Sequence, residues 1–137
     1  GEMHGPWIKG GDTQTTFNGN TLSEIGSGYA NSLAIVNQSG HTSSVAQLCL
    51  DYVDGEGYDD WFLPSKDELN AIYYNLKNNG FIKSILELYH FSSTENLSND
   101  VWIQSFSNGR EFLILKSSDE YYLGLDKFFG LRAVRNF

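Results

Sequence analysis

The sequence contains one cysteine, two prolines and no long apolar run, and each shortage excludes a class of protein. A single thiol, Cys49, cannot form a disulfide within the chain, so the domain is not a small cystine-stapled scaffold. The same count excludes a zinc site built from several cysteines. A membrane-spanning helix needs about 20 apolar residues, so short runs such as Phe112–Leu115 predict no insertion into a membrane.

Basic residues are also few. Nine lysines and arginines stand against 17 acids, and the formal net charge is −8. A phosphate backbone is repelled by such a balance, so we expect no nucleic-acid partner. The first 60 residues carry eight of the acids, one base and ten of the 14 glycines. This composition predicts a loop-rich first part and a more regular second part.

The chain is nevertheless rich enough in apolar residues to fold. Its 137 residues fit one domain, and we expect residues 1–137 to form a single unit. Hydrophobic residues make up 40% of the chain and aromatic residues 15%, which excludes a disordered acidic tail. Cys49 lies in an apolar-periodic stretch, where cysteine is more often a small core residue than a reactive thiol.

Two helices are predicted from periodicity and caps. The first runs from Ser43 or Ser44 to Val53, with a serine as the N-cap. The second starts after Ser65, which forms a capping box with Glu68, and ends near residues 78–80. Residues 81–88 are expected to form a third short helical piece. Gly1–Gly40 shows little periodicity and predicts a long loop with a short strand at Trp7–Ile8, held by three aromatic plugs: Trp7, Phe17 and Tyr29.

The remainder has strand patterns. Short apolar or alternating runs occupy Tyr89–Ser92, Val101–Phe106, Glu111–Lys116 and Leu131–Phe137. The turn at Ser107–Gly109 is a strong hairpin signal because Asn and Gly tolerate a positive φ. A loop, two helices and then an antiparallel sheet give an α+β fold class.

Four segments, in this order along the chain, carry a family pattern. They are Ile25–Ser32, Tyr58–Leu69 with the string DDWFLPSKDEL, Phe91–Asn96, and Leu131–Phe137 with the string RAVRNF. Together with Val101–Phe106 and the Asn108–Gly109 pair, they resemble the C-terminal domain family of Legionella collagen-like proteins. The resemblance covers nearly the whole chain from about His4. The two strings are specific in combination.

The resemblance implies a C-type-lectin-like fold, with two helices flanking a twisted antiparallel sheet and with long irregular loops. It also implies a secreted or surface-displayed bacterial domain, and relatives act in adhesion and glycan binding, some as trimers. The chain is similar as well to the variable proteins of diversity-generating retroelements, whose C-terminal strands and loops carry mutable ligand-contacting positions.

Three features depart from the family pattern. His90-Phe91 replaces the aromatic pair, often Tyr-Trp, that precedes the Ser-Ser-Thr-Glu string. The usual glycine-rich apolar strand before the His-Gly pair is missing, so we expect the chain to begin inside the domain. The acidic composition disfavours sulfated glycosaminoglycans, which need cationic patches.

Ligand contacts are expected in the C-terminal loops. Tyrosine supplies a large amphipathic contact area at low entropic cost, and Ser, Asn and Asp adapt their hydrogen bonds. The expected ligand-binding residues are Asn96, Asn99, Ser118, Asp119, Tyr121 and Tyr122. The alternative is an ordinary loop with one tyrosine buried.

The acidic run from Asp51 to Asp60 suggests calcium, with Asp54, Glu56 and Asp59 as weak candidate ligands. The spacing does not match an EF-hand loop, and the Glu-Pro-Asn and Trp-Asn-Asp signatures of calcium-dependent lectins are absent. We therefore predict no resident cofactor. For Asp59 and Asp60 we favour a structural interpretation over a metal or sugar contact: their carboxylates pin loop amides while Trp61 fills the core.

No catalytic pattern is found. Ser92–Glu95 contains hydroxyls, but no Gly-x-Ser-x-Gly elbow is present and the three histidines have no recognised spacing. Hydroxyls at a strand end more often bond neighbouring backbone. Formylglycine-generating enzymes share the wider fold but use paired cysteines. Arg132 and Arg135 are expected to pair with acids of the first half.

The sequence therefore predicts a non-enzymatic recognition or adhesion domain that binds a glycan or a protein through its C-terminal loops. One alternative is a structural pilus, stalk or trimerisation module, with Phe128, Phe129 and Leu131 on a subunit interface. Another is a diversified ligand-binding variable protein of a retroelement.

Overall fold

The computed structural model describes residues 6–53, 55–78 and 89–118. Within these residues the chain forms three helices and two small antiparallel sheets. This arrangement confirms the predicted α+β class.

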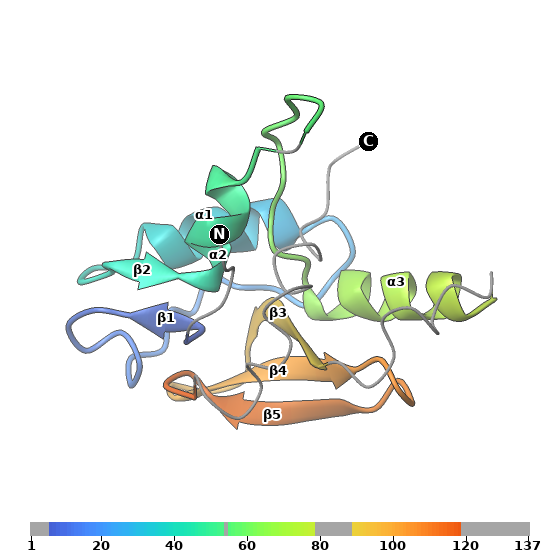
Figure 1. The fold of residues 1–137 in the computed structure, drawn as a ribbon. Helices are drawn as coiled ribbons and strands as arrows, with labels where there is room; N and C mark the ends of the chain where they lie inside the picture. Colours follow the sequence, from blue (N-terminus) through green and yellow to red (C-terminus); the bar gives the residue numbers. More distant parts are fainter. Residues whose placement is uncertain (1–5, 54, 79–88, 119–137) are drawn as a thin grey trace.

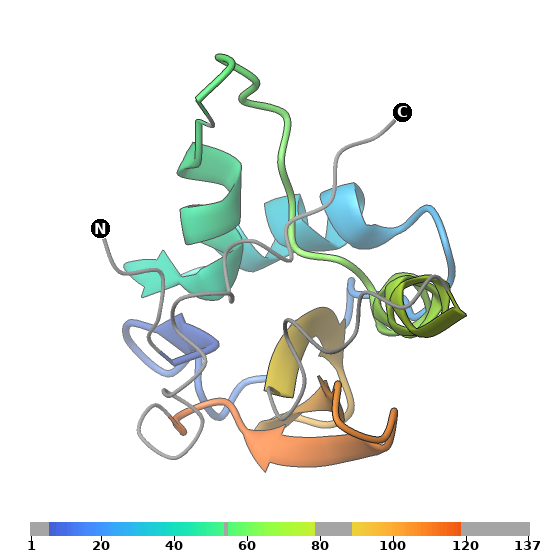
Figure 2. The ribbon, with the colours of Figure 1, turned by 45° about the vertical axis from the view of Figure 1, so that its right-hand side comes forward.

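The three helices are α1 (Gly28–Val36), α2 (Val45–Asp51) and α3 (Lys66–Asn78). In both ribbon views they lie above strands β4 (Asp100–Ser105) and β5 (Glu111–Leu115) of the larger sheet, and α3 lies closer to the strands than α1 and α2 do (Figure 1 and Figure 2). Figure 2, turned by 45°, shows α3 nearly end-on. In this view α1 and α2 lie at the top and the larger sheet lies at the bottom. The extended segment between α2 and α3 therefore crosses from the upper layer to the sheet.

The larger sheet has the strand order β3 (Tyr89–Glu95), β4 (Asp100–Ser105), β5 (Glu111–Leu115), and both pairings are antiparallel. The predicted strands at residues 89–92, 101–106 and 111–116 are confirmed, although β3 extends three residues beyond its expected end. Gly109 in the β4–β5 turn has a φ of 80°, the positive φ that the Asn-Gly pair predicts for this hairpin turn.

The smaller sheet joins the start of the chain to the start of α2. Strand β1 (Ile8–Lys9) pairs antiparallel with β2 (Ser43–Ser44), and Ile8 lies opposite Ser44. The predicted strand at residues 7–8 is thus confirmed to within one residue.

The two predicted helices form with their predicted caps. Ser44 Oγ accepts a hydrogen bond from Gln47 N at 3.0 Å, which satisfies one free amide of α2. At α3 the capping box is reciprocal: Ser65 N donates to Glu68 Oε1 at 2.8 Å, and Glu68 N donates to Ser65 Oγ at 3.3 Å. Local hydrogen-bond chemistry therefore sets both helix starts.

Helix α1 was not predicted, because it lies inside the stretch expected to be a long loop. Its buried residues are Gly28, Asn31, Ser32 and Ile35. Only Ile35 among them is large and apolar, so the helix shows no hydrophobic stripe that periodicity can detect. Polar contacts, described below, hold this helix in place.

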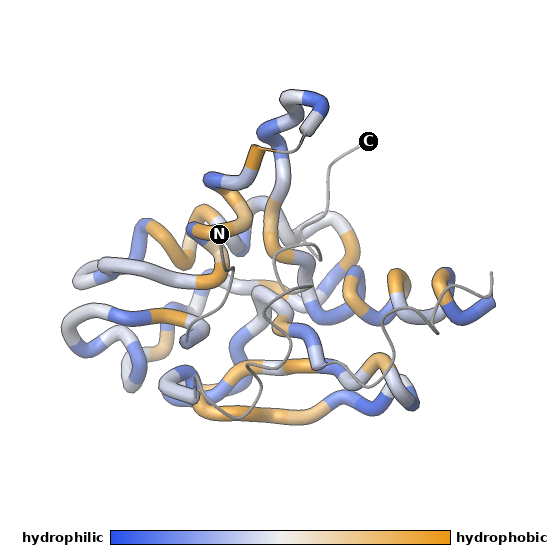
Figure 3. The backbone as a smooth tube through the Cα atoms, viewed as in Figure 1, coloured by the Kyte–Doolittle hydropathy of each residue, from blue (hydrophilic) through white to orange (hydrophobic). Residues whose placement is uncertain are grey.

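The main core lies between the upper helices and the three-stranded sheet. Its buried members are Trp7, Ile8, Ile35, Val45, Ala46, Cys49, Leu63, Phe91, Val101, Ile103 and Ile114. A smaller cluster under α3 holds Leu69, Tyr73 and Phe106. Figure 3 shows the matching pattern: hydrophobic and hydrophilic turns alternate along α3, and hydrophobic colour runs along much of β4 and β5.

The three expected aromatic plugs have different outcomes. Trp7 is fully buried, and its indole N–H donates to Ser92 O at 2.8 Å. Phe17 and Tyr29 are 54% and 49% exposed, so the prediction is wrong for both. Tyr29 instead makes an edge contact with the buried Phe62 ring, with centroids 6.0 Å apart.

Several predictions lie outside the described residues. They are the helical piece at 81–88, the final strand at 131–137, the subunit interface at Phe128, Phe129 and Leu131, and the pairing of Arg132 and Arg135 with acids.

Candidate functional site

Three of the four motif segments meet beside the sheet. Asn31, from the first segment, accepts a hydrogen bond from Leu22 N at 2.8 Å and donates to Leu22 O at 2.7 Å. Its amide also donates to Ser93 Oγ at 3.1 Å. One buried amide side chain thus fixes a loop, α1 and β3 relative to one another.

Further bonds attach the segment before α3. Ser32 Oγ accepts from Leu63 N at 3.0 Å, and Ser93 N donates to Pro64 O at 2.7 Å. Lys66 N donates to Thr94 Oγ1 at 2.9 Å. Residues 25–32, 58–69 and 91–96 therefore form one hydrogen-bonded unit, which we call the frame. The fourth motif segment, 131–137, lies outside the described residues.

The hydroxyls of β3 are occupied within the frame. Ser92 Oγ donates to Trp102 O at 2.8 Å and accepts from Thr94 N at 3.1 Å. Thr94 Oγ1 donates to Leu22 O at 2.9 Å. All three residues from 92 to 94 are buried. The prediction that these hydroxyls bond neighbouring backbone is confirmed.

A buried ion pair anchors the long loop before α1. Lys116 Nζ lies 2.7 Å from Glu95 Oε2, and both side chains are fully buried. Glu95 also accepts hydrogen bonds from Asn18 N at 2.7 Å and Gly19 N at 2.9 Å. Lys116 Nζ donates to Thr16 O at 3.1 Å. A buried charge is costly unless it is paired and hydrogen-bonded, and here both conditions are met.

The pairing of Lys116 with Glu95 was not predicted from the sequence. Lys116 ends the apolar run Leu113–Leu115, where a lysine looks like an exposed strand terminus. The sequence contains only a weak indication of this ion pair: Glu95 ends the Ser-Ser-Thr-Glu string, and Lys116 directly follows an apolar strand.

Asn96, Asn99 and Ser118 lie at one end of the larger sheet. The Asn96 amide donates to both carboxylate oxygens of Asp100 at 3.2 Å, so it stabilises the β3–β4 turn. Asn99 is exposed, and its carbonyl accepts from Lys116 N at 2.8 Å. That bond brings the start of the 116–118 segment against the turn, and Ser118 follows directly.

Three of the six predicted ligand contacts are thus brought to one region. The other three, Asp119, Tyr121 and Tyr122, lie outside the described residues. They follow Ser118 directly in the chain. Their part in ligand binding stays a prediction.

The calcium candidates do not form a cluster in the described part of the chain. Glu56 and Asp59 are exposed, and Asp54 lies outside the described residues. No group of three or more His, Cys, Asp or Glu side chains positioned to hold a metal ion occurs among residues 6–53, 55–78 and 89–118. Calcium binding by Asp54, Glu56 and Asp59 stays a prediction.

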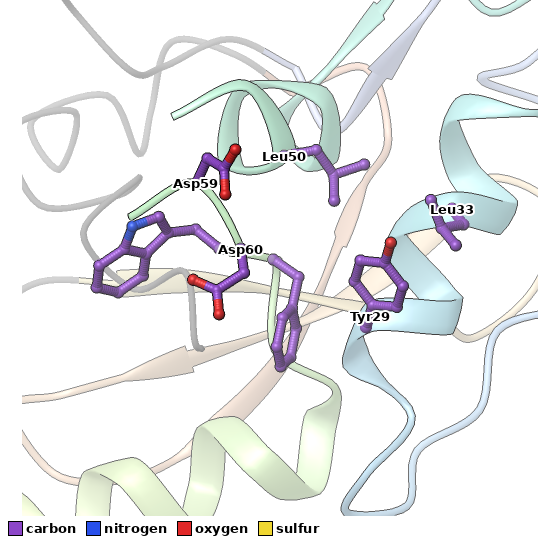
Figure 4. Close-up of a pocket in the computed structure, with 7 residues that line it drawn as sticks. Tyr29, Leu33, Leu50, Asp59 and Asp60 are labelled. Atoms are coloured by element: carbon purple, nitrogen blue, oxygen red, sulfur yellow. The ribbon is translucent and has the colours of Figure 1, made fainter. Parts of the chain in front are cut away.

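A pocket of about 580 Å³ lies between α1, α2 and the extended segment before α3. It is lined by Tyr29, Leu33, Leu50, Asp59, Asp60, Trp61 and Phe62. Figure 4 shows Tyr29 and Leu33 entering from α1, Leu50 from α2, and the two carboxylates from the extended segment. The pocket combines aromatic surface with hydrogen-bond acceptors. Such a mixture suits a ligand with both apolar and donor groups.

Trp61 lies at the edge of this pocket and of the core. It is half-buried and packs against the main core, and its ring makes an edge contact with Tyr52 at 5.8 Å. Its indole N–H donates to Tyr58 O at 3.2 Å. The interpretation of Trp61 as a structural residue is supported.

One residue within α2 and one residue shortly before it have an altered pKa. Burial raises the pKa of the Cys49 thiol to about 12, which confirms that Cys49 is a core residue. Before the start of the helix, His41 Nε2 lies 2.8 Å from Ser44 Oγ. Desolvation lowers the pKa of His41 from 6.5, against a smaller opposing effect of its backbone hydrogen bond.

Comparison with known proteins adds no family. No family model matches the chain, and no curated protein matches it. Within the described residues, none of the helices has the length and apolar character that crossing a membrane requires.

Proposed function

We propose that this protein is a non-catalytic recognition domain with a C-type-lectin-like fold, secreted or displayed on a bacterial surface. It binds a glycan or a protein through loops at the end of the larger sheet. The frame supports this proposal, because its polar groups hold the fold together. A rigid scaffold that leaves polar loops at its edge is the usual way to present binding residues.

The observation that carries the proposal is the junction of Asn99 and Lys116. Their 2.8 Å backbone bond holds the exposed β3–β4 turn against the chain that leads to Ser118. The predicted tyrosines begin three residues later. A surface built from two adjoining loops offers amide, hydroxyl and phenol groups to one ligand.

The test is binding to glycan arrays and to cells. We expect Tyr121→Ala, Tyr122→Ala and Asn99→Ala each to weaken binding while the far-ultraviolet circular dichroism spectrum stays unchanged. Tyr74→Ala is the matched control, because Tyr74 is 49% exposed on α3, away from these loops. Binding that is unchanged in all three variants rejects the site.

A second candidate function, a self-assembling structural module, is favoured by β5. Leu113 and Leu115 are 42% and 50% exposed, and in the described sheet β5 pairs with β4 on one side only. Exposed leucines on a sheet edge favour association with another chain. Light scattering at high concentration tests this function: assembly that Leu113→Lys abolishes supports it, and a monomer rejects it.

A further inference from the structure

A second, smaller groove lies away from the C-terminal loops. It has a volume of about 330 Å³ and runs between the loop before α1 and the end of α1. Its lining includes Phe17, Asn18, Asn37, Gln38 and Ser39. None of its lining residues is charged. In a protein of net charge −8, this is a neutral surface rich in amides and hydroxyls.

Phe17 provides exposed aromatic surface at this groove. Its side chain is 54% exposed although large apolar residues are usually covered. The ring lies over Gly19, where an added Cβ would be 3.6 Å from Phe17 Cε2. An exposed ring with a negative π face attracts the weakly positive C–H groups of a flat ligand.

The loop that carries Phe17 is fixed on both sides. Glu95 accepts the amides of Asn18 and Gly19, and Lys116 donates to the carbonyl of Thr16. The buried ion pair therefore holds the backbone on either side of Phe17. Because the loop is already ordered, a ligand that stacks on the ring does not have to pay for ordering it.

The two walls of the groove are also joined to each other. Asn18 Nδ2 donates to Ala34 O at 2.9 Å and to Gln38 Oε1 at 3.0 Å. Gln38 Nε2 in turn donates to Thr16 O at 3.3 Å. These bonds fix the distance between the Phe17 loop and the end of α1.

Two polar side chains remain available to a ligand. Asn37 and Ser39 are exposed, and neither side chain makes a hydrogen bond to another described residue. A primary amide and a hydroxyl each donate and accept, which matches the adjacent hydroxyls of a sugar ring. The lining contains no carboxylate, and the sugar contacts proposed below use an aromatic ring, an amide and a hydroxyl without a metal ion.

We propose that this groove binds one neutral pyranose ring, stacked on Phe17 and hydrogen-bonded by Asn37 and Ser39, without a metal ion. Its volume lies at the lower end of the range for ligand pockets, about 300–1,000 Å³, which suits a monosaccharide unit. The site shares the recognition role of the proposed function, but it uses residues 16–39 instead of the C-terminal loops.

The experiment is saturation-transfer NMR on the full chain with neutral methyl glycosides of glucose, mannose, galactose and N-acetylglucosamine, in the presence of EDTA. We expect transfer to the ring protons of at least one glycoside. Phe17→Ala should weaken that binding about tenfold, whereas Phe17→Tyr should retain it. Asn37→Ala should weaken it as well, and Tyr74→Ala should leave it unchanged.

The outcomes separate the two proposals. Transfer that Phe17→Ala removes and Tyr121→Ala leaves intact supports the groove. Transfer that responds to Tyr121→Ala but not to Phe17→Ala overturns the groove and supports the C-terminal loops. Absence of transfer to all four glycosides at millimolar concentration also overturns the groove. Since Phe17 is largely exposed, its variants are expected to fold, and circular dichroism checks this.

Discussion

Lys116 and Glu95 form an ion pair of 2.7 Å that is closed to solvent and yet serves a loop nearly a hundred residues earlier in the chain. The carboxylate accepts two loop amides, and the ammonium donates to a loop carbonyl. The pair therefore satisfies backbone groups of residues 16–19, which lie outside any helix or strand and have no regular hydrogen-bond pattern of their own.

Removal of one partner should be severe. We expect Lys116→Met to lower the free energy of unfolding by about 3–5 kcal/mol, because Glu95 would stay buried without its counter-charge. Urea denaturation measures this change. The exposed Lys77 on α3 provides the control: Lys77→Met should shift stability by less than about 1 kcal/mol. If Lys116→Met is as stable as Lys77→Met, the ion pair of Lys116 and Glu95 does not contribute to the stability of the fold.

Gly28 should tolerate no side chain. A Cβ at this position would clash with Glu68 Oε1, and it would lie 2.8 Å from the Phe62 ring and 2.9 Å from Leu63 O. Because the carbonyl belongs to the fixed frame, we expect Gly28→Ala to cost about 1–3 kcal/mol. Gly55→Ala is the control, since no atom lies within 4 Å of its added Cβ. Thermal melting that ranks the two variants equally contradicts the packing at Gly28.

Cys49 should be unreactive until the domain unfolds. Its pKa of about 12 and its burial leave almost no accessible thiolate at neutral pH. We expect no reaction with Ellman's reagent in buffer and one equivalent of released thiolate in concentrated urea. Rapid labelling of the folded protein would mean that α2 opens readily, and the Cys49→Ala variant supplies the blank.

His41 should couple stability to acid. Its folded pKa lies below 6.5, so the unfolded chain binds the proton more tightly and protonation favours unfolding. Stability is then highest above the unfolded pKa and falls as the pH drops through it. Urea melts between about pH 8 and pH 5 should show a shallower loss for His41→Gln than for the parent chain. NMR titration of the His41 ring protons measures its pKa in the folded protein. A value at or above 6.5 would contradict the expectation.

The elements predicted correctly are those whose signals are local. Ser44 and Ser65 cap their helices by bonding amides three residues away, and Gly109 turns the hairpin in place. Such signals can be read from neighbouring residues alone. Helix α1 was missed because Asn31 and Ser32, which face inward, form their bonds with Leu22, Ser93 and Leu63 from other parts of the chain.

The candidate site was predicted less well for a related reason. Phe17 and Tyr29 were expected inside because aromatic residues in a long loop often plug a core. Whether such a ring is buried depends on which distant part of the same chain packs against it. The glycines and polar residues next to the ring in the sequence do not indicate this. Asn96, expected to meet a ligand, also stabilises its own turn through Asp100, and its contact with a ligand stays a prediction.

The indole of Trp7 donates to Ser92, 85 positions further along the chain. A nascent polypeptide consequently carries this tryptophan unshielded until β3 has been synthesised. Because pairings between distant positions form slowly, early intermediates present an apolar surface to chaperones and to other unfinished chains. Yield during expression should therefore depend on how quickly the second half of the chain follows the first.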